Sequence, residues 1–129
     1  KKARLVPHTI TSILEGRRPV IFGDGAAKRA LVYVKDVVRF LMLGLERLTN
    51  VQGGIFNVGG QEEYSVQSVI QEICRQMAWT GGIEYRPGPQ ALRSDPPLSI
   101  EKARTLGWLP STSLEQGLKE TIQSYRGLP

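Results

Sequence analysis

The chain has 129 residues, about the length of one domain with its own hydrophobic core. Hydrophobic residues make up 40% of it and charged residues 22%, which excludes the apolar-poor composition of a disordered chain. The net charge of +5 favours anionic partners, either phosphorylated metabolites or nucleic acid.

Membranes, disulfides and nucleic acid are disfavoured by simple features of the sequence. No apolar run approaches the roughly 20 residues of a membrane span, and residues 1–14 lack the features of a signal peptide, so we expect a cytoplasmic protein. Cys74 has no second cysteine for a disulfide or a zinc site and is interpreted as a buried packing residue. The basic residues are dispersed and not interleaved with aromatic residues, which disfavours a nucleic-acid groove.

The first third of the chain predicts a helix, two short strands and a second helix. Residues 7–14 begin with a proline and carry apolar residues at helical spacing. The β-rich runs 20–22 and 31–34 flank Gly23-Asp24-Gly25, which indicates two strands around a turn. Asp36 is positioned to cap a long helix. The apolar residues of that helix recur at helical spacing, at Val37, Leu41, Leu45 and Leu48.

The middle of the chain predicts a strand, an amphipathic helix and another strand. Residues 55–58 form a short β-rich run between two glycine pairs. Ser65 is a typical cap for the next helix, whose apolar residues fall on one stripe. A strand is expected at 83–85, and the four prolines of residues 86–97 predict an irregular connection.

Two helices are expected at the end of the chain. A short one spans residues 99–106, and a last one begins at Thr112 and Glu115, which have the spacing of a capping box. Helices that alternate with short strands indicate an α/β fold in which helices cover a small sheet. Because the strands are few and no strand precedes the first helix, we expect part of a larger layer that leaves apolar surface uncovered and forms homo-oligomers.

Familiar catalytic motifs are incomplete. Residues 23–28 nearly spell the dinucleotide fingerprint Gly-x-Gly-x-x-Gly, but Lys28 replaces the third glycine and a β-rich run follows where a helix is needed. No tyrosine has a lysine four residues later, His8 has no evident partner, and no cluster of metal-ligand residues occurs. We therefore predict no catalytic residue, no cofactor-binding residue and no metal site, and we expect the chain alone to be inactive.

A longer series of motifs resembles the carboxyl-terminal region of the extended short-chain dehydrogenase/reductases, the NAD(P)-dependent sugar-nucleotide epimerases and dehydratases. Gly23-Asp24-Gly25, Arg29 and residues 32–37 are similar to the family's Gly-Asp-Gly, Arg-Asp and Tyr-Val-x-Asp-Val. Further matches follow in the family's order at Phe56-Asn57-Val58-Gly59, Arg86-Pro87-Gly88, Lys102-Ala103, Leu106-Gly107-Trp108-Leu109-Pro110 and Ser113 to Leu118.

The resemblance implies that residues 1–129 are the substrate-binding part of an extended Rossmann-type enzyme whose partner is a nucleotide-diphosphate sugar. It also implies that the parent enzyme uses NAD or NADP, held by an amino-terminal domain that lies outside this chain. Asp36, Asn57 and Trp108 carry the resemblance but are interpreted as a helix cap, a hydrogen bonder at a strand end and a packing anchor.

The candidate substrate-binding residues are Arg29, Arg86 and Arg93. In the family, the residue that matches Arg29 contacts the diphosphate and the arginine of Arg-Pro-Gly contacts it from the far side. A guanidinium suits this role because its planar fork of donors matches phosphate oxygens. Ala30 and Pro89 stand where the family has aspartates, and the longer spacing after Arg86 makes Arg93 a competitor for the second phosphate contact.

Other interpretations remain open at the level of sequence. Arg29 and Arg86 could each be a solvated charge or an ion-pair partner. The whole chain could be a standalone, non-catalytic domain on the same scaffold that binds a nucleotide ligand or a protein, or a small basic nucleic-acid binder. The motifs distinguish neither epimerase from dehydratase nor NAD from NADP.

Overall fold

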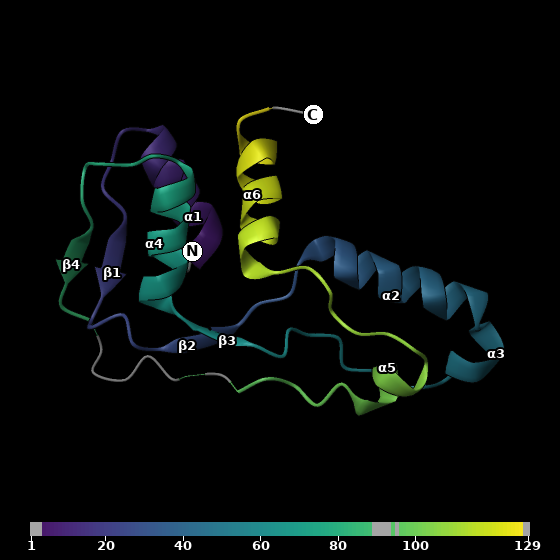
Figure 1. Ribbon diagram of the computed structural model, residues 1–129. Helices are drawn as coiled ribbons and strands as arrows, with labels where there is room; N and C mark the ends of the chain where they lie inside the picture. Colours follow the sequence, from purple (N-terminus) through teal and green to yellow (C-terminus); the bar gives the residue numbers. More distant parts are fainter. Residues whose placement is uncertain (1–3, 89–93, 95, 128–129) are drawn as a thin grey trace.

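The computed structural model describes residues 4–88, 94 and 96–127 and shows short strands beside larger helices (Figure 1). In chain order, the elements of the described residues are α1 (Leu5–Leu14), β1 (Val20–Phe22), β2 (Lys28–Ala30), α2 (Val34–Glu46), α3 (Leu48–Val51), β3 (Glu63–Ser65), α4 (Val66–Gln76), β4 (Glu84–Arg86), α5 (Glu101–Thr105) and α6 (Leu114–Tyr125). The mixture of helices with a few short strands confirms the α/β class. Within the described ranges, every helix is too short or too polar to serve as a membrane span.

The strands in the described part of the chain form two separate two-stranded ribbons. β1 pairs in parallel with β4, in the register Val20 to Glu84 and Phe22 to Arg86. β2 pairs antiparallel with β3, with Arg29 opposite Tyr64. The sequence predicted strands at 20–22 and 31–34 around the glycine turn. β1 lies at the first of these, whereas β2 lies at 28–30, and the two do not pair with each other.

The main core lies between α1, α4 and α6, which pack side by side in Figure 1. α4 begins at Ser65, whose hydroxyl accepts a hydrogen bond from the Ser68 backbone N–H, as the sequence predicted. The buried side of α4 is the apolar stripe expected from its periodicity, and Cys74 is buried within it. Burial of its thiol raises the pKa of Cys74. The core comprises Ile10, Ile13, Ile21, Val69, Ile70, Ile73, Cys74, Met77, Leu118 and Ile122.

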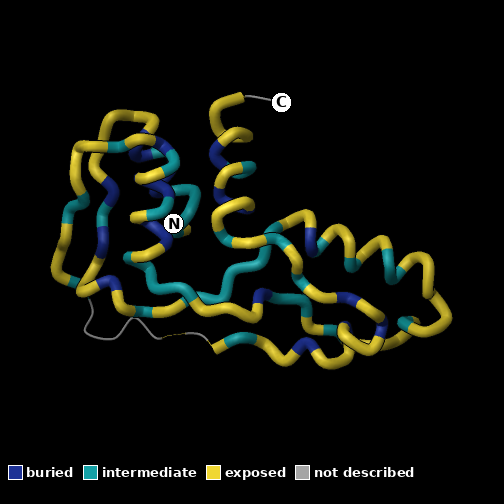
Figure 2. Tube along the Cα trace, in the orientation of Figure 1, coloured by how far each residue is buried: buried dark blue, intermediate teal, exposed yellow. Residues whose placement is uncertain are grey.

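A second, smaller core lies under α2 and α5. It consists of Ile100, Ala103 and Trp108, with the partly buried Phe40, Leu43 and Val58 packed against it. The ring centroids of Phe40 and Trp108 are 5.7 Å apart in an edge-to-face arrangement. Trp108 is only 2% exposed, so its predicted role as a packing anchor is confirmed. Figure 2 shows that buried residues are sparse along α2.

Two predicted strands are wrong. The run 31–34 is not a strand, since β2 ends at Ala30 and α2 already begins at Val34. Residues 55–58 belong to no strand because no ladder forms along them. Asn57 instead donates a side-chain hydrogen bond to the Ser99 carbonyl at 3.1 Å, and Gln61 donates one to the Leu98 carbonyl at 3.2 Å. Amide side chains therefore hold this extended segment against residues 98–99.

Two predicted helix caps also differ from the structure. Asp36 does not cap α2, because it lies in the first turn of that helix, beyond the N-cap residue Tyr33. The N-cap of α6 is Ser113, whose hydroxyl accepts from the Gln116 backbone N–H, and not Thr112. Both differences have one cause, because the Asp36 carboxylate accepts a hydrogen bond from the Thr112 backbone N–H at 3.0 Å and so ties α2 to the approach to α6.

Candidate functional site

The glycine turn after β1 has a conformation that requires glycine. Gly23 and Gly25 have φ angles of +76° and +73°, a region that other residues rarely adopt. The Asp24 carboxylate accepts a hydrogen bond from the Ala26 backbone N–H at 2.9 Å, which closes the turn. A Cβ on Gly25 would lie 3.0 Å from the Gln67 Cβ and 3.1 Å from the Ile21 Cγ2. The turn is therefore packed against the start of α4.

The carboxyl end of β4 meets this turn, so two motifs far apart in the sequence lie together. The Gly23 backbone N–H donates to the Arg86 carbonyl at 3.0 Å. A Cβ on Gly88 would be 2.9 Å from the Phe22 Cβ, so only glycine fits there without displacement. On the other side of the turn, the Lys28 backbone N–H donates to the Ser94 hydroxyl at 3.0 Å. Gly88 and Ser94 thus both lie at the glycine turn.

The structure places the predicted arginines on different ribbons around this turn. Arg29 lies on β2, is partly buried, and donates from Nη1 to the Lys28 carbonyl at 2.6 Å. Arg86 lies on β4 and is exposed; its Nε is 2.6 Å from the Glu84 Oε1, and its Nη2 donates to Oε2 at 3.1 Å. This pairing raises the pKa of Arg86 and lowers the pKa of Glu84. Arg93 lies outside the described residues.

Phe22 is a further candidate that the sequence reasoning missed. Its side chain is 47% exposed, although it stands at the end of β1 beside Gly23 and Gly88 and is paired in register with Arg86. An exposed aromatic ring next to cationic side chains can stack on a nucleobase. The sequence carried a signal for this exposure. Successive side chains of a strand point to opposite sides, so a buried Ile21 predicts that Val20 and Phe22 face the other way. The sequence analysis predicted a strand at 20–22 and did not consider which of its side chains would be exposed.

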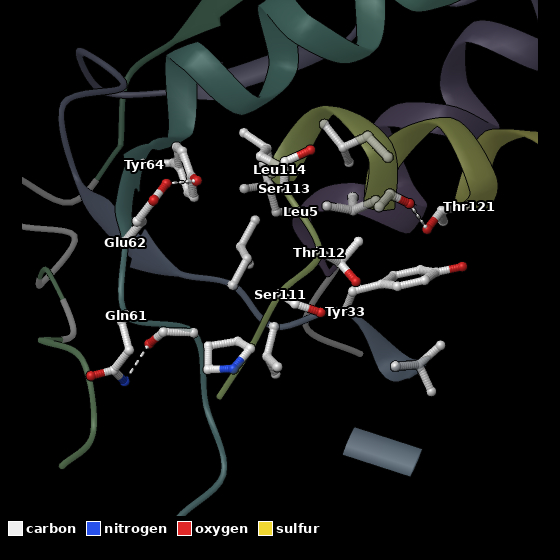
Figure 3. Close-up of a pocket in the computed structure, with 18 of the residues that line it drawn as sticks. Leu5, Tyr33, Gln61, Glu62, Tyr64, Ser111, Thr112, Ser113, Leu114 and Thr121 are labelled. Atoms are coloured by element: carbon white, nitrogen blue, oxygen red, sulfur yellow. Dashed lines mark hydrogen bonds between the residues drawn. The ribbon is translucent and has the colours of Figure 1, made fainter. Parts of the chain in front are cut away.

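A separate cavity of about 960 Å³ opens between the start of α1, residues 31–34 and the approach to α6 (Figure 3). Tyr64 lines it, and burial together with a hydrogen bond to Glu62 raises the pKa of Tyr64 to about 12. Neither Arg29 nor Arg86 lines this cavity. The hollow therefore does not coincide with the site that the motifs indicate.

A charged network lies at the rim of the cavity. The Glu120 carboxylate accepts hydrogen bonds from the Tyr33 hydroxyl at 2.8 Å, from the Lys35 ammonium at 2.5 Å and from the Gln116 amide at 2.8 Å. These donors, Lys35 first, lower the pKa of Glu120 to about 2. The network joins the start of α2 to α6 and leaves its carboxylate fully engaged, so we interpret it as structural.

The chemistry available at the glycine turn is that of binding. It offers arginine side chains, an exposed aromatic ring and close backbone approach, which together suit a nucleotide with phosphate groups. Among the residues that the structure describes, no group of three or more His, Cys, Asp or Glu is arranged to hold a metal ion.

Comparison with known proteins agrees with the order of the motifs. Residues 1–59 match the NAD dependent epimerase/dehydratase family. A UDP-N-acetyl-alpha-D-glucosaminuronate decarboxylase from Bacillus cytotoxicus is 30% identical over 96% of this chain and 40% of its own length. Decarboxylases thus join the epimerases and dehydratases that the motifs indicated.

Solved structures give the same result. The UDP-glucose 4-epimerase of Thermotoga maritima, solved with UDP-glucose, superposes with a TM-score of 0.83 at 30% identity over 98% of this chain and 40% of that chain. The dTDP-glucose 4,6-dehydratase of Bacillus anthracis, solved with NAD, gives a TM-score of 0.77 at 29% identity over 96% and 39%. The chain thus spans about two fifths of the length of these proteins. In sequence and in fold, it is related to the sugar-nucleotide epimerases and dehydratases of the extended short-chain dehydrogenase/reductase family.

Proposed function

We propose that residues 1–129 form the nucleotide-sugar-binding part of an NAD- or NADP-dependent epimerase or dehydratase. The observation that carries the proposal is the meeting of two family motifs at one place. The Gly23 backbone N–H donates to the Arg86 carbonyl, which brings the Gly-Asp-Gly turn and the Arg-Pro-Gly segment into direct contact. The related epimerase that superposes on nearly the whole chain was solved with UDP-glucose, a ligand of the proposed class.

In this proposal Arg29 and Arg86 hold the diphosphate from two ribbons. A diphosphate can compete with Glu84 for the guanidinium, because it also accepts from two donors of the fork together and carries more negative charge than one carboxylate. Ligand binding would therefore draw Arg86 away from Glu84, with which it pairs at 2.6 Å. Phe22 would lie against the base, since its exposed ring stands beside the end of β4.

The chemistry of the sugar would depend on residues outside these 129. The dehydratase of Bacillus anthracis was solved with NAD, a cofactor that supplies hydride transfer when bound. For this chain we propose a positioning role, in which the binding energy of the nucleotide orients the sugar. We also propose that the isolated chain self-associates through the apolar surface that its fold leaves exposed.

Calorimetric titration of the chain with UDP-glucose and dTDP-glucose tests the proposal. We expect saturable binding, and we expect UDP alone to retain most of it because the contacts are made to the nucleotide diphosphate. Uridine, which lacks the phosphates, serves as the control and should bind at least about tenfold more weakly, since each charged hydrogen bond contributes about 1.5 to 3 kcal/mol. Equal affinities for uridine and UDP would contradict the assignment of a diphosphate site.

A further inference from the structure

The outer face of the β1–β4 ribbon carries an ion pair beside the proposed nucleotide site. Glu84 and Arg86 are two residues apart on β4, so their side chains lie on the same face. Ile21, in the middle of β1, is buried in the main core, so that face points away from the core. It also carries Phe22, which is paired in register with Arg86. The cation and the ring that we assign to the nucleotide therefore share this face with a carboxylate.

This carboxylate occupies one edge of the guanidinium. The Arg86 Nε lies 2.6 Å from the Glu84 Oε1, and Nη2 donates to Oε2 at 3.1 Å. Two donors of the fork on two oxygens is also the arrangement in which a guanidinium binds a phosphate. A phosphate that uses this edge must therefore displace Glu84. The two side chains are 53% and 40% exposed, so burial does not lock the pair and the exchange requires no change in the core.

The charges around Glu84 identify Arg86 as its main partner. The Glu84 backbone N–H donates to the Pro19 carbonyl at 2.9 Å, which brings Glu84 close to Arg18 as well. The hydrogen bond from Arg86 does most to lower the pKa of Glu84, and the charge of Arg18 adds a smaller effect. The carboxylate is therefore ionised at neutral pH and is held mainly by the residue that the ligand would use.

We infer that Glu84 is an internal competitor for Arg86 that limits the affinity of the nucleotide site, an inference that rests on the proposed function. The carboxylate occupies Arg86 in the free chain and recaptures it when the phosphate leaves. A ligand whose phosphate uses Arg86 thus binds more weakly than the arginine alone would allow, whereas a nucleoside without phosphates is unaffected. Since uniformly tight binding lowers KM without raising kcat, an enzyme loses little by such a limit.

Calorimetric titration with UDP-glucose compares the parent chain, Glu84→Gln, Arg86→Ala and the double variant. Glutamine keeps the size of the side chain but not its charge. Glu84→Gln should therefore bind about three- to fivefold more tightly than the parent, which is what an exposed ion pair of good geometry contributes. Arg86→Ala should bind more weakly than the parent. The gain from Glu84→Gln should vanish when Arg86 is already alanine, since no guanidinium is left to compete for.

Glu15→Gln is the matched control, because Glu15 also pairs with an arginine two residues away, Arg17, but lies just after α1. It removes the same charge and should leave the affinity unchanged. Glu84→Asp keeps the competing charge and should stay close to the parent. Uridine should bind equally to the parent and to Glu84→Gln. Glu84 and Glu15 both lie at the surface, so the melting temperature of each variant should match that of the parent.

Two kinds of result would overturn the inference. One is a Glu84→Gln variant that binds UDP-glucose no more tightly than the parent; weaker binding would mean that Glu84 positions Arg86 for the ligand. The other is an equal gain from Glu15→Gln, or a gain that persists in the Arg86→Ala background, because the general field would then be its cause. In both cases saturable binding by the parent leaves the proposed function intact. If neither the parent nor Glu84→Gln binds UDP-glucose, both proposals fail.

Discussion

At the scale of single residues, Asp36 connects two motifs that are far apart in the sequence, residues 32–37 and the segment from Leu106 to Pro110 with the residues after it. Its carboxylate accepts from the Ser111 and Thr112 backbone N–H groups and pairs with Arg39 at 3.0 Å. Its backbone carbonyl accepts from the Trp108 indole at 2.8 Å. One aspartate in the first turn of α2 therefore positions both the anchor of the second core and the approach to α6.

Asp36→Asn should lower the free energy of unfolding by about 2 kcal/mol. The amide keeps the shape of the side chain but replaces an acceptor with a donor, so it opposes the N–H groups it faces, and hydrogen bonds to charged groups contribute about 1.5 to 3 kcal/mol. Asp24→Asn is the control, because Asp24 is exposed and accepts only the hydrogen bond of a local turn. Urea denaturation measures both, and equal small losses would contradict a central role for Asp36.

Arg29→Ala should weaken nucleotide-sugar binding about ten- to a hundredfold, the equivalent of one charged hydrogen bond. Arg29→Lys should restore only part of the loss, since an ammonium cannot reproduce the bidentate fork. The control is Arg18→Ala, which removes the same charge from a residue that precedes β1 and matches no phosphate-binding motif. Calorimetry with UDP-glucose compares the three variants. If Arg18→Ala and Arg29→Ala cause equal losses, Arg29 contributes only to the general positive field.

At the scale of elements, local signals predicted the helices well and the pairing of strands poorly. The apolar stripe and the serine cap of α4 are local features, so its bounds could be derived from the sequence. The partner of β1 could not be derived in this way, because it is β4, more than sixty residues away in the chain. A strand of three residues has too little sequence pattern to identify the strand with which it pairs. The cap of α6 was misplaced by one residue because the Asp36 contact to Thr112 is tertiary.

The same distinction applies to the candidate site. The glycine turn and Arg29 could be found from their motifs, because close backbone approach and phosphate binding demand particular residue types. That Arg86 pairs with Glu84 could have been suspected from their spacing, since residues two apart on a strand share a face. The exposure of Phe22 could have been suspected from the alternation along β1, whereas its place beside Gly88 and Arg86 depends on how β1 and β4 meet and was beyond local reasoning.

Gly25 and Gly16, which both have a positive φ, offer a matched pair for testing the effect of close packing. Gly25→Ala should lower the free energy of unfolding by about 2 to 4 kcal/mol, because a positive φ and overpacking each cost about 1 to 2 kcal/mol or more. Gly16 has nearly the same φ, +70° against +73°, but a Cβ there would meet nothing within 4 Å. Gly16→Ala should therefore cost only about 1 kcal/mol. Thermal unfolding followed by calorimetry checks the difference.

The link between α2 and α6 should respond to acid. Hydrogen bonds from Lys35, Gln116 and Tyr33 lower the pKa of Glu120 from 4.5 to about 2. A depressed pKa in the folded state stabilises the fold above the ordinary pKa, and the contribution is lost as the pH falls from about 4.5 towards about 2. Glu120→Gln should thus be less stable than the parent at neutral pH, with a deficit that shrinks across this window. Urea denaturation at several pH values measures it, and a deficit independent of pH would contradict the assignment.

At the scale of the whole molecule, the class of fold followed from the alternation of helices and strands, whereas the arrangement did not. The sequence predicted a single small sheet under its helices. Among the residues that the structure describes there are two ribbons and two cores, and Trp108 gathers the apolar neighbours of the second core. The uncovered surface expected of a partial layer is found on α2.

The second core has a consequence for the cooperativity of the molecule. Three buried residues form it, against ten in the main core, and its helix α2 buries only Asp36. Opening this part would expose little apolar surface, so its free energy of opening should be well below that of global unfolding. Amide hydrogens of α2 and α5 should exchange with solvent at least about tenfold faster than those of α4. Equal protection in α2 and α4, measured by exchange mass spectrometry, would mean that the chain unfolds as one unit. If the difference is found, α2 and α5 form a foldon of their own, which can open while the main core stays folded.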